Sequence, residues 1–300
     1  SPEATVTAIR EQVGRGLSAM LPTKDAAVVS ADLAARFKLP LWQFTVSATD
    51  ANRHVIRYSR LITGKSKIIV IDRCYHGSVD ETFATLDKKG KTVAREGNIG
   101  APVDLDLTTR VVPFNNLAAM KKALANDDVA AILMEPAMTN VGIVLPIDGY
   151  LKGVEKLAKE FGAMLIIDET HTISVGPGGM TGELGLAPDF LTIGKAIGGG
   201  FPTGAFGMSQ AVADSIKKLV ELEVIDTGGI GGTLAANALS LAAMKATLSK
   251  VLTKENFDRM IKLGNRWADG VEKTIQKYQL PWTVNRLGAR AEYMFSQTTP

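Results

Sequence analysis

Cysteine is nearly absent from this sequence: Cys74 is the only one among 300 residues. A single cysteine excludes an internal disulfide framework and is typical of a reducing compartment, so we expect a cytoplasmic protein. No apolar run approaches the roughly 18 residues that a membrane span needs, and the first residues show no signal-peptide pattern. The sequence therefore predicts no membrane partner.

An excess of one charge is also lacking. The 34 Lys and Arg residues nearly balance the 31 Asp and Glu residues, and no basic run interleaves with the few aromatic side chains. Without such a basic surface we expect no nucleic-acid partner. Hydrophobic residues, in contrast, make up 46% of the chain. A globular chain of this length and composition can bury a large core.

The two ends of the sequence suggest a fragment. The first residues, Ser1-Pro2-Glu3, are typical of a helix start, with a serine suited to the N-cap and a proline suited to the first helical position. The last residues, Thr299-Pro300, come shortly after a strand-like stretch. We expect that an N-terminal segment and most of a C-terminal domain are missing.

Short apolar runs alternate with helical patterns through the first 250 residues. Continuous apolar runs between helices are typical of parallel strands that are covered on both faces. This pattern predicts an α/β fold of three layers with a mostly parallel central sheet. The expected strands are 41–46, 68–71, 129–134, 164–167 and 190–193.

The pattern changes near residue 250. A long helical stretch follows, and then two strand-like runs at 281–284 and 289–295. We therefore divide the chain into a large domain over residues 1–250 and a linker helix with the beginning of a small α+β domain over 251–300.

Polar or glycine-rich clusters directly follow several of the expected strands. Parallel sheets bind ligands beyond the carboxyl ends of their strands, so these clusters are expected to form one composite site. The clusters are 47–52, 72–77, 135–142, 168–172 and 194–200.

Asp168 and Lys195 are the two residues in these clusters that most strongly indicate chemistry. Asp168 ends a buried strand, where an unpaired carboxylate is costly; taken by itself, it is better explained by an ion pair or a helix cap. Lys195 stands between apolar residues and glycines, although most lysines are solvated. Partial desolvation would lower the pKa of this amine and favour a Schiff-base nucleophile. The alternative is a lysine whose head reaches solvent from a strand end.

A series of motifs, taken in order, resembles the class III aminotransferases, a branch of the fold type I pyridoxal-phosphate enzymes. Glutamate-1-semialdehyde aminomutase and amine or β-amino-acid transaminases are the nearest relatives that this resemblance suggests. The motifs are Ser47-Ala48-Thr49-Asp50-Ala51-Asn52, Tyr75-His76-Gly77, Glu135-Pro136, Asp168-Glu169-Thr170, Gly194-Lys195-Ala196 and Gly232-Thr233-Leu234.

The resemblance implies pyridoxal 5'-phosphate as the cofactor and assigns roles to the matching residues. Lys195 would hold the cofactor aldehyde as a Schiff base and then transfer a proton. Asp168 would pair with the protonated ring nitrogen. Ala48 and Thr49 would present backbone N–H groups and a hydroxyl to the phosphate at a helix N-terminus. Thr233 would reach the phosphate of a neighbouring subunit, which implies a homodimer with shared sites; it could also be a helix N-cap.

The resemblance places further residues around the ring. Tyr75 would stack on the pyridine ring, and His76 completes the same motif. His171 stands where relatives often have a glutamine that contacts the ring hydroxyl, and Thr170 stands where a branched apolar residue commonly backs the ring. Glu135 would lie behind these residues, and Asn140 could face the substrate. His54 is expected to be structural and Cys74 inert.

The sequence supports other functions less well. Gly198 to Gly204 does not fit the dinucleotide-binding pattern G-x-G-x-x-G, and Gly64-Lys65-Ser66 lacks the first glycine of a P-loop because Ser59 takes its place. Within the enzyme interpretation, we expect an aminotransferase that acts on an amine or amino acid and a keto acid, because the segments around Glu135 and Asp168 differ from the aminomutase patterns. The alternative is a glutamate-1-semialdehyde 2,1-aminomutase, which moves the amino group within one molecule.

Overall fold

The computed structural model describes residues 1–19, 21–100, 103–221 and 229–296. Its centre is a seven-stranded sheet of order β1-β9-β8-β7-β6-β2-β5. The strands are β1 (Leu41–Thr45), β2 (Lys67–Ile71), β5 (Thr109–Val112), β6 (Val129–Met134), β7 (Met164–Asp168), β8 (Phe190–Gly194) and β9 (Gly204–Met208).

The sheet is mostly parallel, as the sequence predicts. Strands β5, β2, β6, β7 and β8 pair in parallel, whereas β9 runs antiparallel to both β8 and the edge strand β1. Two of these strands, β5 and β9, are absent from the strands expected from the sequence. The fold class is confirmed, and the five predicted strands are present with ends that shift by at most one residue.

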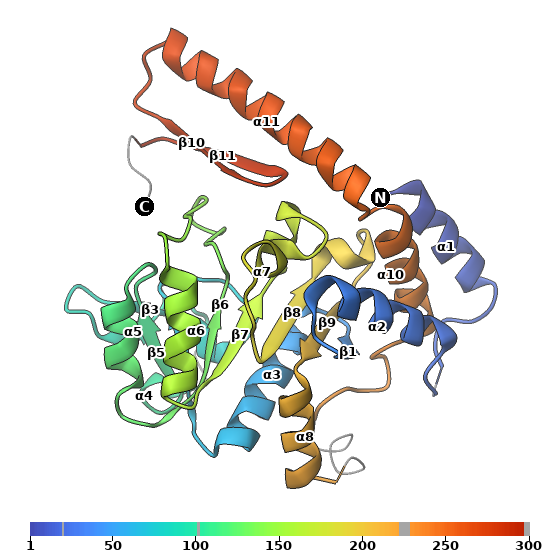
Figure 1. Ribbon diagram of the computed structural model, residues 1–300, viewed down its shortest axis with the longest axis horizontal. Helices are drawn as coiled ribbons and strands as arrows, with labels where there is room; N and C mark the ends of the chain where they lie inside the picture. The colour runs from blue at the N-terminus through green and yellow to red at the C-terminus, as the bar shows by residue number, and fades with distance from the viewer. Residues whose placement is uncertain (20, 101–102, 222–228, 297–300) are drawn as a thin grey trace.

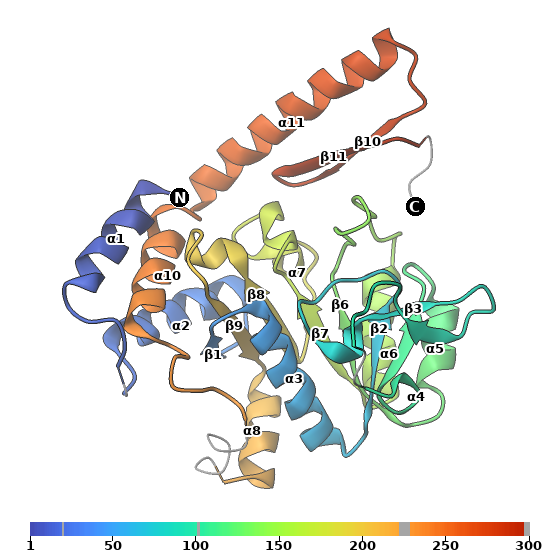
Figure 2. The same cartoon turned by 180° about the vertical axis from the view of Figure 1, so that it is seen from behind.

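Helices cover both faces of the sheet (Figures 1 and 2). Helices α5 and α6 lie on one face, and α3 lies on the other. The helices are α1 (Glu3–Val13), α2 (Lys24–Phe37), α3 (Ala48–Thr63), α4 (Leu105–Thr108), α5 (Leu117–Leu124), α6 (Tyr150–Glu160), α7 (Gly179–Glu183), α8 (Gln210–Leu219), α10 (Ala238–Lys250) and α11 (Lys254–Lys277). Short 3₁₀ turns are η1 (Asp80–Thr82), η2 (Thr172–Val175) and η3 (Lys195–Gly198), and β3 (Ala84–Leu86) and β4 (Thr92–Ala94) form a small hairpin.

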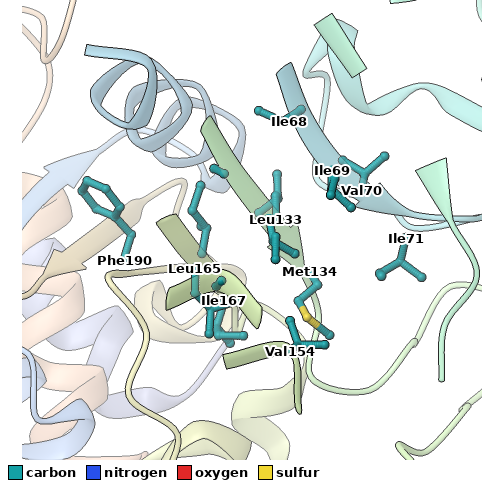
Figure 3. Close-up of a cluster of buried hydrophobic side chains, with 14 of the residues drawn as sticks. Ile68, Ile69, Val70, Ile71, Leu133, Met134, Val154, Leu165, Ile167 and Phe190 are labelled. Atoms are coloured by element: carbon teal, nitrogen blue, oxygen red, sulfur yellow. The ribbon is translucent and has the colours of Figure 1, made fainter. Parts of the chain in front are cut away.

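The core lies between the sheet and its helices, where the apolar strand residues meet (Figure 3). Every residue of β6 and of β8 is buried. Burial of this kind contributes about 25 cal/mol for each Å² of apolar surface, so the sheet is the rigid part of the molecule. The loops that follow the strands are therefore held by a rigid scaffold.

Helix α3 is fixed at both ends by its sequence. The Ser47 hydroxyl caps the first turn by accepting from the Asp50 amide at 3.2 Å. Gly64 ends the helix in the left-handed region with φ 67°, because glycine adopts this conformation without a steric penalty. The two caps place the N-terminus of α3 at the end of β1. The predicted Ser1 cap of the first helix is wrong: α1 begins at Glu3, and its N-cap is Pro2, which has no side-chain donor or acceptor.

The last elements lie apart from the sheet. Helix α11 crosses above the carboxyl ends of the strands, and a hairpin of β10 (Thr283–Leu287) and β11 (Arg290–Met294) lies beneath it (Figure 1). Hydrogen bonds dock the hairpin on the main body. Among them, Asn285 Nδ2 donates to the Ile143 carbonyl at 2.8 Å, and the Ala289 amide donates to the Ser174 carbonyl at 2.9 Å. The proposed division at residue 250 stays a prediction. Within the described residues, the helices are too short or too polar to cross a bilayer.

Candidate active site

The carboxyl ends of the strands open into a cavity of about 670 Å³. All the site residues predicted from the sequence except Thr233 and Asn140 line it: Ala48, Thr49, Tyr75, His76, Glu135, Asp168, Thr170, His171 and Lys195. They come from loops after five different strands, so the composite site expected from the strand-end clusters has a physical cavity. The roles of these residues stay predictions.

Asp168 is held rigidly at the end of β7. It is 4% exposed, and the Thr170 amide donates to its Oδ1 at 3.0 Å. Its Oδ2 receives a hydrogen bond of 3.0 Å from Asn52 and lies 2.9 Å from Nδ1 of His76. Three partners fix the orientation of this carboxylate before any ligand binds.

These partners keep Asp168 ionised. Burial alone would raise the pKa of Asp168, but the hydrogen bond and charge of His76, with the bonds from Thr170 and Asn52, lower this pKa to about 2. Burial alone would also lower the pKa of His76, yet its neighbours Cys74 and Asp168 hold that pKa well above the ordinary value. The pair is therefore a fixed negative carboxylate beside a cationic imidazole, at the wall of a cavity.

Lys195 directly follows β8 and has an unusual backbone. Its φ is 44°, in the left-handed region that residues other than glycine rarely adopt. Backbone strain of this kind is concentrated at functional sites. The predicted desolvation of Lys195 is wrong: the residue is exposed, because the cavity is open on the side from which the lysine projects.

The N-terminus of α3 also faces the cavity through Ser47, Ala48 and Thr49. Thr49 Oγ1 accepts from the Ser78 amide at 3.1 Å, which ties the helix to the loop after β2. Gly77 lies against this hydroxyl: a Cβ on Gly77 would come within 2.1 Å of Thr49 Oγ1. Glycine is thus required here both for the contact and for its φ of +79°. A helix N-terminus with free N–H groups favours an anion.

Tyr75 forms another part of the wall. Its ring is 43% exposed and meets Phe83 edge-on, with centroids 6.4 Å apart. Because its face is not covered by Phe83, the ring can stack on a planar ligand.

A second polar network joins Glu135, Thr139 and His171. The Thr139 hydroxyl bonds to both Glu135 and His171, and Asn140 Nδ2 donates to Glu135 Oε1 at 3.2 Å. Burial raises the pKa of Glu135 to about 7, and burial together with the charges of Lys195 and Arg290 lowers the pKa of His171 to about 4. Arg290 in β11 donates to the Thr139 carbonyl at 2.8 Å, so the hairpin braces this network.

Comparisons with known proteins agree with this geometry. A model of the aminotransferase class-III family matches residues 4–299. The chain belongs to the class-III aminotransferase family. Glutamate-1-semialdehyde 2,1-aminomutase 1 of Staphylococcus carnosus is 37% identical over 83% of this chain and 57% of that protein. The chain thus spans a little more than half the length of this curated relative.

Solved structures of class-III type resemble the chain over its whole length. A glutamate-1-semialdehyde-aminomutase from Pseudomonas aeruginosa PAO1 is 47% identical with a TM-score of 0.96, covering 100% of this chain and 67% of the other. A further structure of that protein is a complex with PMP. An omega-transaminase from Sphaerobacter thermophilus is 29% identical with a TM-score of 0.89, covering 100% and 69%. The family and the PMP complex indicate pyridoxal phosphate as the cofactor.

The cavity fits this class-III cofactor. The fixed carboxylate of Asp168 suits a cationic ring nitrogen, the amine of Lys195 suits an aldehyde, and the start of α3 suits a phosphate. Two buried polar atoms beside the cavity, Thr170 Oγ1 and His76 Nε2, have no hydrogen-bond partner among the described residues. Such atoms are expected where a ligand supplies the missing contact.

Thr233 lies in an exposed turn and does not line the cavity of its own chain. It is not a helix N-cap either, since Asn237 caps α10, which begins at Ala238. His54 is buried in α3 and accepts from the Gly231 amide at 3.2 Å, in line with a structural role.

Sequence reasoning gave no role to Asn52, although it lies within a quoted motif. Its side chain contacts Asp168, the His76 carbonyl and Thr192. The available signal was an amide residue directly after Ala51, on the apolar side of α3, and the structure shows that it is buried.

Proposed function

We propose that the complete protein binds pyridoxal phosphate in this cavity and moves an amino group within glutamate 1-semialdehyde, as a 2,1-aminomutase does. The observation that carries the proposal is the convergence of Lys195 and Asp168 on one cavity with the N-terminus of α3. The choice of reaction is supported by higher identity to proteins named as aminomutases, 47% and 37%, than to the omega-transaminase, 29%.

Bound pyridoxal phosphate supplies a conjugated cationic ring that accepts electrons from the carbon next to the amino group. Asp168 keeps the ring nitrogen protonated, because its own pKa of about 2 leaves it ionised at neutral pH. Near a protein surface, two unit charges in contact attract with about 4 kcal/mol before desolvation. The Nζ of Lys195 would hold the cofactor aldehyde and would serve as the acid and base that carries a proton. Thr49 and the first amides of α3 hold the phosphate.

Intermolecular amino transfer between an amine or amino acid and a keto acid is the second candidate. It is supported by the Glu135–Thr139–His171 network, because the segments 135–140 and 168–171 differ from the patterns associated with the aminomutase. We also propose that the protein acts as a homodimer in the cytoplasm, with the exposed Thr233 of each subunit completing the phosphate site of the other.

The two reactions are separated by an assay of the full-length holoenzyme. With glutamate 1-semialdehyde as the sole substrate, we expect complete conversion to the isomer that carries the amino group on carbon 1. Amines supplied with pyruvate are expected to react far more slowly. Turnover of the amine and pyruvate mixtures, without any conversion of the semialdehyde, would replace the aminomutase with the second candidate.

The cofactor anchor is tested separately by borohydride reduction. Reduced holoenzyme is expected to retain the cofactor covalently, and Lys195→Ala to retain none and to lose more than about a thousandfold in rate. Lys254→Ala removes an exposed lysine and is the control. Covalent retention in Lys195→Ala would refute the assignment.

A further inference from the structure

A second cavity of about 540 Å³ adjoins the proposed cofactor cavity. Tyr75 lines both cavities, so it lies at their boundary. On the far side of Tyr75 the wall includes two guanidinium groups, Arg73 and Arg95, together with Asn140 and Glu96. Neither arginine has a role in the function proposed above.

Arg73 has a backbone that its side chain does not favour. Its φ is 62°, in the left-handed region where glycine is the usual residue. Its nearest ion-pair contact is long, 4.0 Å from Nε to Asp72 Oδ2, and its side chain is 69% exposed. Asp72 is bound elsewhere, because its Oδ1 accepts from Thr85 at 2.6 Å and from the Leu86 amide at 3.1 Å. The guanidinium of this strained residue is therefore left available for an external partner.

Arg95 is positioned more rigidly. Its Nη2 donates to the Cys74 carbonyl, and its backbone amide donates to the Phe83 carbonyl at 2.9 Å. Its Nε is buried and has no hydrogen-bond partner among the described residues. A buried N–H of a charged group without an acceptor is costly, and a carboxylate oxygen would satisfy it.

We propose that Arg73 and Arg95 bind the carboxylate at the far end of the substrate, on the opposite side of Tyr75 from the cofactor. The inference rests on the proposed function, and it narrows the substrates to acidic amino compounds such as glutamate 1-semialdehyde. Guanidinium groups match the planar carboxylate, and two of them outweigh the single Glu96 in the wall. Asn140, whose Nδ2 bonds to Glu135 Oε1 at 3.2 Å, connects this pocket to the cofactor cavity.

Binding of glutarate to the holoenzyme tests the site without any reaction, since glutarate has two carboxylates and no amine. We expect Arg73→Gly and Arg95→Gln each to weaken glutarate binding in calorimetry by about tenfold or more, the usual effect of losing a hydrogen bond to a charged group. Arg73→Gly relieves the left-handed strain, so its Tm is expected to stay level or rise. Lys91→Gln removes an exposed positive charge from the same hairpin region and is the matched control.

Kinetics provide the second readout. Both arginine variants are expected to raise KM for acidic amino substrates and to leave KM for an amine without a carboxylate unchanged. Arginine-dependent glutarate binding without any conversion of the semialdehyde would sink the aminomutase proposal and support the pocket. Unchanged glutarate affinity and unchanged KM in both variants would overturn the pocket, whichever reaction the enzyme performs.

Discussion

Asn52 connects helix α3 to Asp168. Its Nδ2 donates to Asp168 Oδ2 at 3.0 Å and to the His76 carbonyl at 3.1 Å, and its Oδ1 accepts from the Thr192 hydroxyl at 2.7 Å. The same helix begins at the proposed phosphate site. One rigid element thus sets the distance between Asp168 and the proposed phosphate site, which is how an active site is preorganised.

Asn52→Leu removes this connection at nearly constant volume. We expect the free energy of unfolding to fall by about 1–3 kcal/mol, because buried partners lose their hydrogen bonds. Cofactor affinity is expected to fall about tenfold, as Asp168 is no longer held in place. Denaturant unfolding and cofactor titration measure the two effects, with Asn98→Leu, at a weaker hydrogen bond of 3.4 Å, as the control. Equal cofactor affinity in both variants would show that Asn52 does not contribute to cofactor binding.

Gly77→Ala tests the close contact at the start of α3. Its Cβ would lie 2.1 Å from Thr49 Oγ1, so this hydroxyl must move. Gly90→Ala is the matched control, since Gly90 has a similar φ of +75° and open space around its Cβ position. Both variants pay about 1–2 kcal/mol for the left-handed backbone. Gly77→Ala is expected to lose roughly 1–3 kcal/mol more and to bind inorganic phosphate more weakly. Equal losses in the two variants would contradict the contact.

Glu135→Gln tests the buried acid. Burial raises the pKa of Glu135 from 4.5 to about 7. Between these values the unfolded chain has released the proton and the folded chain has kept it, so Glu135 makes the wild type lose stability as the pH rises. The free energy of unfolding of the wild type, relative to that of Glu135→Gln, is therefore expected to be lower at about pH 8 than at about pH 5. The expected change is a few kcal/mol at most. His171 remains in both proteins, which reduces its influence on the difference.

Unfolding curves at the two pH values, with Glu11→Gln at an exposed site as control, provide the measurement. A stability difference that does not change with pH would mean that Glu135 is ionised at neutral pH.

Thr233 provides the test of shared sites. Sedimentation of the full-length protein is expected to show a homodimer. Thr233→Val is expected to weaken cofactor binding and to leave the dimer intact. Mixed dimers of Lys195→Ala and Thr233→Val subunits would regain activity, because one of their two sites then has both native residues. A fully active monomer, or the absence of recovery in mixed dimers, would contradict the shared site.

Apolar runs identified β2, β6, β7 and β8, because a strand that is buried on both faces appears in the sequence as an uninterrupted run of apolar residues. They could not identify β9, whose Gly204 and Gly207 have no side chains and instead admit the Ser47 carbonyl and the Trp42 ring. Likewise β5 begins with Thr109 and Arg110, and its pairing with β2 is a tertiary effect.

For the site, the family motifs located the charged residues near the cofactor. Partners such as Thr139 and Arg290 were not predictable, because they are joined by folding across 151 residues and leave no local pattern. The exposure of Lys195 was mispredicted for a related reason: its apolar sequence neighbours point into the core, while its own side chain points outward.

The left-handed backbone of Lys195, with φ 44°, has a consequence for protein engineering. Glycine at this position would release strain of about 1–2 kcal/mol, so selection for heat resistance alone favours loss of the amine to which we assign the cofactor. Libraries built to make this enzyme more durable should therefore keep codon 195 fixed, and consensus scores at that position should be read as a record of chemistry and not of folding.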